Sequence, residues 1–127
     1  MSNKKVESHR DLVVWQKCHD LVQQIFRTTE KFSKKEQNLL GKRLRDAAIV
    51  VPTNIAIGFE KRSLKLKIEA YREALTQITR IQYMLELADA LGETKSSHAL
   101  IEEWDKVYKM LKGLIRANSS SSSASGS

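Results

Sequence analysis

Apolar residues recur every three or four positions along four long stretches of this chain, and nowhere do they alternate with polar residues for the length of a strand. This spacing is typical of amphipathic helices and predicts an all-α domain. The stretches run from about residue 11 to 31, 36 to 61 and 63 to 91, and the last begins near residues 94–97 and runs to 118. Because only short turns separate them, neighbouring helices must run antiparallel, which predicts an up-down-up-down four-helix bundle.

The first predicted helix carries two apolar stripes side by side. One stripe consists of Leu12, Trp15, His19, Val22 and Phe26. The other consists of Val14, Cys18, Leu21 and Ile25. A single bundle core needs a narrower apolar face than this, so we expect one stripe to face the helix's own bundle and the other to face a second subunit. The pattern therefore predicts a homo-oligomer.

The second predicted helix contains the single proline of the chain, Pro52, whose missing amide hydrogen predicts a kink. Asn54 follows two residues later. Its side-chain amide either satisfies a backbone group freed by the proline or is an ordinary exposed polar group. Gly58 indicates a close contact with another helix.

Polar residues at the ends of the apolar stretches predict where the helices begin and end. We expect Asp11 to open the first helix as a cap or first-turn acid, and Ser63 to cap the third. Gly92 follows the end of the third helix, and Asn118 is expected to end the fourth.

The length of 127 residues corresponds to about one domain. Residues 1–9 are polar and are expected to form a flexible tail, and residues 10–117 the four-helix bundle. Residues 118–127 are rich in serine and are expected to be a disordered tail. The longest uncharged run, residues 47–59, is too short to cross a bilayer. The chain has one cysteine, and its first residues show no short basic run followed by an apolar stretch, so we do not expect secretion. We therefore expect a cytoplasmic protein that does not enter a membrane.

Few side chains have the spacing that catalysis or metal binding requires. No histidine completes a Glu-x-x-His pair, and the chain has no phosphate-binding loop and no pair of metal-spaced cysteines. Cys18 is interpreted as a small buried hydrophobe and His19 as a packed histidine. Trp15 and Trp104 lie on apolar stripes, which favours packing over base stacking. We expect no enzyme activity, no cofactor and no metal.

Charge gives the first indication of a partner. The net charge is +7 and the isoelectric point is about 9.6. Residues 1–67 hold 15 basic and 7 acidic side chains, whereas residues 68–127 hold 7 and 8. Such an excess favours a polyanion such as RNA or DNA, bound through its phosphates, although the charges alternatively serve solubility alone. The predicted nucleic-acid-binding residues are Lys34, Lys35, Lys42, Arg43, Arg45, Lys61, Arg62, Lys65 and Lys67.

Several segments resemble a known family. Residues 10–17 and 32–36, the Leu-Arg-x-Ala-Ala motif at 44–48 and the Pro-x-Asn-Ile-Ala motif at 52–56 resemble four-helix-bundle proteins encoded in intervening sequences of bacterial large-subunit ribosomal RNA genes. The similarity covers about residues 10–92. The same family includes Avd, the accessory variability determinant that works with the reverse transcriptase of diversity-generating retroelements.

The resemblance implies a ring-like homopentamer of four-helix bundles whose basic surface meets nucleic acid and a reverse transcriptase. This chain departs from the family pattern at Ser33 and Asp46, and it has Ile57 and Arg80 where the pattern has acidic residues. The loss of two acids favours nucleic-acid binding and the Avd branch, or it marks a different oligomer contact. We therefore expect an accessory subunit of a reverse transcriptase, the alternative being an intervening-sequence protein that acts as a structural protein-interaction oligomer.

Overall fold

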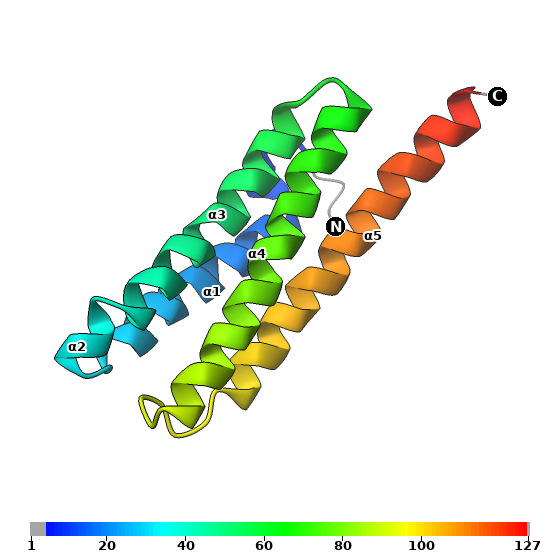
Figure 1. The fold of residues 1–127 in the computed structure, drawn as a ribbon. Helices are drawn as coiled ribbons and strands as arrows, with labels where there is room; N and C mark the ends of the chain where they lie inside the picture. The colour runs from blue at the N-terminus through cyan, green and yellow to red at the C-terminus, as the bar shows by residue number, and fades with distance from the viewer. Residues whose placement is uncertain (1–4, 127) are drawn as a thin grey trace.

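The computed structural model describes the backbone of residues 5–126 and the side chains of residues 5–119. The described residues form four long helices. Figure 1 shows that these helices pack side by side, with consecutive long helices running in opposite directions. The elements in chain order are η1 (His9–Asp11), α1 (Val13–Glu30), α2 (Lys34–Gln37), α3 (Leu40–Glu60), α4 (Leu64–Ala90) and α5 (His98–Gly126). The predicted all-α bundle of four long helices is confirmed.

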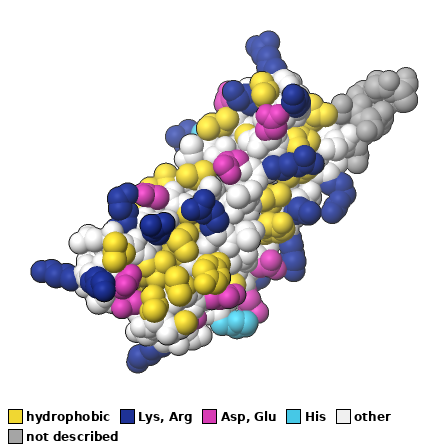
Figure 2. Space-filling model, in the orientation of Figure 1, with side chains coloured by type: hydrophobic (Ala, Val, Ile, Leu, Met, Phe, Trp, Pro, Cys, Tyr) yellow, Lys and Arg dark blue, Asp and Glu magenta, His cyan; other side chains and the backbone are white. Residues whose placement is uncertain are grey.

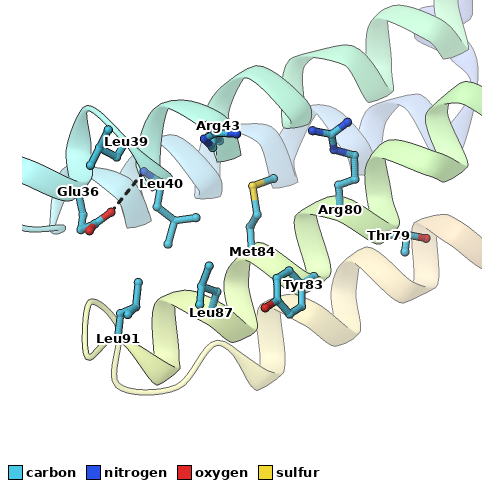
Figure 3. Close-up of a pocket in the computed structure, with 10 residues that line it drawn as sticks. All are labelled: Glu36, Leu39, Leu40, Arg43, Thr79, Arg80, Tyr83, Met84, Leu87 and Leu91. Carbon is cyan, nitrogen blue, oxygen red and sulfur yellow. Dashed lines mark hydrogen bonds between the residues drawn. The ribbon is translucent and has the colours of Figure 1, made fainter.

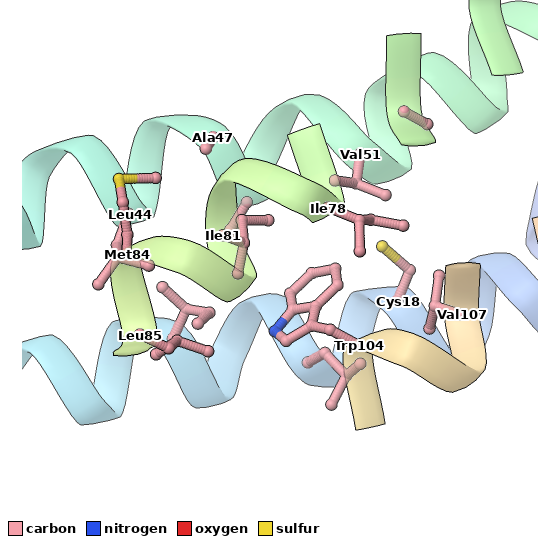
Figure 4. Close-up of a cluster of buried hydrophobic side chains, with 14 of the residues drawn as sticks. Cys18, Leu44, Ala47, Val51, Ile78, Ile81, Met84, Leu85, Trp104 and Val107 are labelled. Atoms are coloured by element: carbon pink, nitrogen blue, oxygen red, sulfur yellow. The ribbon is translucent and has the colours of Figure 1, made fainter. Parts of the chain in front are cut away.

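Each long helix packs against two neighbours. The contact between α3 and α4 is the most extensive, α1 packs on α3, and α5 packs on α4 and α1. Trp104 on α5 lies in the middle of this core, among Cys18, Ile78 and Ile81 (Figure 4). Burial raises the pKa of the Cys18 thiol far above its usual range. The interpretation of Cys18 and Trp104 as packing residues is therefore confirmed.

Pro52 lies inside α3, and α3 bends as predicted (Figure 1). The proline removes the hydrogen bond that the carbonyl of Ala48 would accept in a regular helix. Asn54 is half-buried and donates from Nδ2 to the carbonyl of Val50 at 3.1 Å. Its amide therefore serves a different carbonyl from the one the proline frees, and neither sequence-based alternative for Asn54 is right.

The second predicted helix is divided into two in the structure, which is a correction. Ser33 Oγ accepts a hydrogen bond from the Glu36 amide and starts α2. The side-chain amide of Gln37 donates to the carbonyls of Glu30 and Phe32, which folds α2 back onto the end of α1. Leu39 then leaves the helical conformation, with φ −109° and ψ −90°, before α3 begins. These side-chain bonds end α2 after one turn.

Some of the other helix ends lie where the sequence predicts them, and others do not. The predictions for Ser63, which accepts from the Leu66 amide at 3.3 Å, and for Gly92, whose φ is 76°, are confirmed. The prediction that Asp11 opens the first long helix is wrong. Its carboxylate accepts from the amides of Glu7 and Ser8 and so caps the N-terminal end of η1 instead of α1. Residues 1–4 of the expected N-terminal tail lie outside the described residues.

The last helix continues past the expected end at Asn118. The backbone of α5 is helical to Gly126, and Asn118 Nδ2 donates to the carbonyl of Leu114 at 2.8 Å. No proline or glycine interrupts residues 114–125, so nothing in the local sequence breaks the helix there. Placing the helix end at Asn118 is therefore wrong, and residue 127 lies outside the described residues.

Candidate nucleic-acid interface

The nine predicted cations do not form one continuous patch. Five of them lie on α2 and the first turns of α3, and four lie after the end of α3 and on the first turn of α4. α3 contains 21 residues and is therefore about 30 Å long. The structure separates the two groups by the length of this helix, although they are close in sequence.

Arg45 is part of the fold. Its guanidinium donates from Nη1 to Thr29 Oγ1 and from Nη2 to the Gln37 carbonyl, both at 3.0 Å. It also lies 6.0 Å from the centre of the Phe26 ring. Thr29 is fully buried and Arg45 is itself half-buried, so its guanidinium joins α1, α2 and α3 and is less open to a phosphate than the exposed cations.

Lys67 is also held by the protein. Its ammonium donates to the carbonyls of Gly58 at 2.7 Å and Phe59 at 3.1 Å. These carbonyls end α3, where the helix dipole is negative, so the lysine caps the helix. Burial lowers the pKa of Lys67, against the opposing field of Glu60. Lys67 therefore stabilises the turn between α3 and α4.

The remaining predicted residues face solvent. Lys42 forms an exposed ion pair with Asp46 at 2.6 Å, which partly neutralises it. The other six are exposed and form no ion pair with any residue that the structure describes. These six free cations are Lys34, Lys35, Arg43, Lys61, Arg62 and Lys65.

The fold adds cations that sequence analysis did not include. Lys31 at the end of α1 and Lys95 in the loop before α5 line one hollow, at the end of the bundle that carries α2. Glu93 holds this loop to α2, because its carboxylate accepts from the amide and the hydroxyl of Ser33 at 2.6 and 3.1 Å. Lys95 lies in the half of the chain whose charges balance, so no sequence signal pointed to it.

The two stripes of the first helix have different environments. Its second stripe is buried in the core, whereas Trp15 is half-buried and His19 is exposed. The Trp15 ring stacks on His19 with ring centres 5.0 Å apart, and with Ile49 and Ile57 of α3 these residues line an apolar hollow of about 390 Å³. We call this surface the α1/α3 face. Interpreting Trp15 and His19 as core residues is therefore only partly right.

Neither catalysis nor membrane insertion gains support from the described residues. No group of three or more histidine, cysteine or acidic side chains is placed to hold a metal ion within the described part of the chain. None of the described helices combines the length and the apolar character needed to cross a bilayer.

The family model described as 23S rRNA-intervening sequence protein matches residues 10–113, which is most of the chain. No curated protein matches the chain.

Proposed function

This chain belongs to the 23S rRNA-intervening sequence protein family, and we propose that it is a non-enzymatic, oligomeric helical bundle that binds RNA, or RNA paired with DNA, as an accessory subunit to the reverse transcriptase of a diversity-generating retroelement. The observation that carries the proposal is the set of six free cations at the two ends of α3. Exposed lysine and arginine side chains without internal partners are available to phosphate groups.

The expected mode of binding follows from this placement. Each free cation neutralises a phosphate and releases a counterion, so the contacts add and read little base sequence. The two groups lie about 30 Å apart along α3, so one nucleic acid that meets both must extend along the bundle. We assign no phosphate contact to Arg45 and Lys67, because their hydrogen bonds hold them within the fold.

The test is a salt series of RNA binding. Replacing Lys34, Lys35, Lys61 and Lys65 together by glutamine is expected to lower the salt slope by about four units and to weaken binding accordingly. The matched control replaces four other exposed cations by glutamine, which changes the net charge equally. These control positions are Arg72, Lys109, Lys112 and Arg116. Equal losses in both variants, or no loss in the first, would refute this interface.

The reverse-transcriptase partner is supported by the two departures from the family pattern, Ile57 and Arg80, which make the chain more basic. The test is affinity purification from the native host, with and without nuclease. Recovery of a reverse transcriptase together with one structured RNA supports the accessory role. Recovery of ribosomal RNA alone, or of nothing at moderate salt, contradicts it.

The α1/α3 face favours a second candidate, a structural protein-interaction oligomer. Trp15, Ile49 and Ile57 are partly exposed large side chains on one surface, and a second copy of the chain would cover them. The family resemblance implies a pentamer. We expect Ile57→Glu to shift the mass measured by light scattering toward the monomer and Leu66→Glu, at a similarly exposed site on α4, to leave it unchanged. A monomeric wild-type protein at micromolar concentration would refute the oligomer.

A further inference from the structure

An apolar groove lies on the outer side of α3 and α4, away from the α1/α3 face. Its volume is about 610 Å³. The apolar side chains that line it are Leu39, Leu40, Tyr83, Met84, Leu87 and Leu91 (Figure 3). At least half of the surface of three of these side chains is exposed: 50% for Leu39, 62% for Tyr83 and 53% for Leu91. Figure 2 shows hydrophobic side chains gathered over the seam between the two helices. We call this surface the α3/α4 groove.

The groove has the shape of a helix-binding furrow. Tyr83, Leu87 and Leu91 are spaced by four residues and therefore form one row along α4. The stretch from Thr79 on α4 to Leu91, which caps the C-terminal end of that helix, is about 18 Å long and corresponds to about three turns of a bound helix. A furrow between two packed helices accepts the apolar stripe of a third helix.

The charges at the groove are uneven. Arg43 on α3 and Arg80 on α4 are exposed and form no ion pair with the described residues, and both also line a neighbouring hollow. The acid in that hollow, Asp46, is held by Lys42. At the opposite end, the Glu36 carboxylate accepts from the backbone amide of Leu40. One end of the groove therefore presents two cations without internal partners.

We propose that the α3/α4 groove binds an amphipathic helix of a partner protein, with the apolar stripe of that helix on the α4 row and its acidic side chains against Arg43 and Arg80. This proposal rests on the proposed function in one respect: an accessory subunit needs a protein partner, and the groove would be the surface that binds this partner. Complementary charge selects such a helix and orients it along the groove.

A second copy of this chain fits the groove less well. On α5, the exposed Lys112 and Arg116 form no ion pair with the described residues, and Arg43 and Arg80 would repel them. Lys106 and Lys109 on the same helix are paired with Glu103 and Asp105. The α1/α3 face of a second copy is the surface already proposed for the subunit contact. An acidic helix from another protein is therefore the occupant that the charges favour.

The experiment uses the full chain and two labelled synthetic peptides of about 14 residues, enough for four helical turns. In both peptides, leucines recur at alternating intervals of three and four residues, so that they form one stripe along a helix. One has glutamates on the flanking positions and the other has lysines. Binding is measured by fluorescence anisotropy at low salt, where charge selection is strongest. We expect the glutamate peptide to bind at least tenfold more tightly than the lysine peptide.

Two pairs of variants separate the apolar and the charged parts of the groove. Tyr83→Ser with Leu91→Ser is expected to weaken the glutamate peptide at least tenfold, whereas Leu66→Ser, at an exposed site near the start of α4, is the matched control. Arg43→Glu with Arg80→Glu is expected to reverse the preference between the peptides. Lys61→Glu with Lys65→Glu makes the same charge change at the far end of α3 and should leave the preference in place.

Three results would overturn the proposal. They are equal binding of the two peptides, binding that Tyr83→Ser with Leu91→Ser leaves unchanged, and a wild-type oligomer that these two substitutions dissociate. The last result would make a second copy the occupant. RNA affinity of the same variant separates the two proposals, because the serine variant should bind RNA like the wild type. The four-lysine variant should lose RNA binding and still bind the glutamate peptide, because none of its four positions lines the groove.

Discussion

Gly58 is the position where a single methyl group tests the packing of α3 on α4. A Cβ atom built on Gly58 would lie 2.5 Å from Cε1 and 2.8 Å from Cδ1 of Tyr71. The Tyr71 ring is 2% exposed and cannot swing into solvent. Gly58→Ala therefore forces the two helices, or the buried ring, to move.

Two opposing effects set the magnitude. Overpacking a closely packed site costs about 1–3 kcal/mol. Replacing glycine by alanine inside a helix recovers about 1 kcal/mol of helix propensity. Because two Tyr71 ring atoms would lie closer than 3.0 Å to the new methyl group, the cost of overpacking lies in the upper part of its range, at about 2–3 kcal/mol. We therefore expect Gly58→Ala to lower the free energy of unfolding by about 1–2 kcal/mol, which lowers the midpoint of urea denaturation by about 0.5–1 M for a protein of this size.

Gly113 supplies the matched control, because no heavy atom lies within 4 Å of a Cβ built there on α5. Gly113→Ala is expected to raise the free energy of unfolding by up to about 1 kcal/mol through propensity alone. Combining Gly58→Ala with Tyr71→Leu should destabilise by less than the sum of the two changes, since the smaller side chain leaves room for the methyl group. A Gly58→Ala midpoint equal to or above that of the wild type would refute the reasoning.

Three further predictions concern single side chains. Arg45→Met removes the two bonds that tie α3 to α1 and α2, and it should lower the free energy of unfolding by about 1–3 kcal/mol while leaving RNA affinity within twofold of the wild type, as measured by denaturation and titration. Hydrogen bonds from Lys106 and Lys17 lower the pKa of Glu103 from 4.5 to about 2. Because the pKa is lowered in the folded state, the stabilisation is present above pH 4.5 and is lost as the pH falls toward 2; Glu103→Gln should flatten this part of a stability-against-pH curve, and an unchanged curve would contradict the assignment. Burial raises the pKa of the Cys18 thiol, so iodoacetamide should label it in urea and not in the folded protein, as followed by mass spectrometry.

The features that sequence analysis predicted correctly are set by residues close together along the chain. The period of three to four apolar residues identifies each helix, and the Ser63 cap and the bend at Pro52 depend on contacts within one or two turns. The errors at Asp11 and Asn118 also involve short-range bonds, from the Ser8 amide to Asp11 and from Asn118 to the carbonyl of Leu114. The division of the second predicted helix has a different cause. Gln37 ends α2 by bonding to the end of α1, which no local pattern in residues 34–38 indicates.

In the candidate interface, too, the sequence shows which residues are charged, and the fold determines which of them have internal partners. All nine cations looked equivalent in the sequence, because a lysine on a basic stretch carries no mark of its partner. Arg45 and Lys67 differ from the other seven only because Thr29 lies 16 residues away and Gly58 lies 9 residues away, within hydrogen-bonding reach in the folded chain. Lys95 is the opposite case, because it lies far from the basic residues in sequence and close to Lys31 in space. The loop that carries it is held to the start of α2 by Glu93.

By itself the sequence determined the helical class of this protein, its bundle of four long helices and its excess of positive charge, because periodicity, composition and short-range sterics are properties of neighbouring residues. The tertiary structure decided which stripe of α1 is buried and which cations have no internal partner. It also decided that leucines of α3 meet Tyr83 and Leu87 of α4 in one groove. These outcomes depend on how helices distant in sequence rotate and pack against one another, and that is settled by the shape of the whole core.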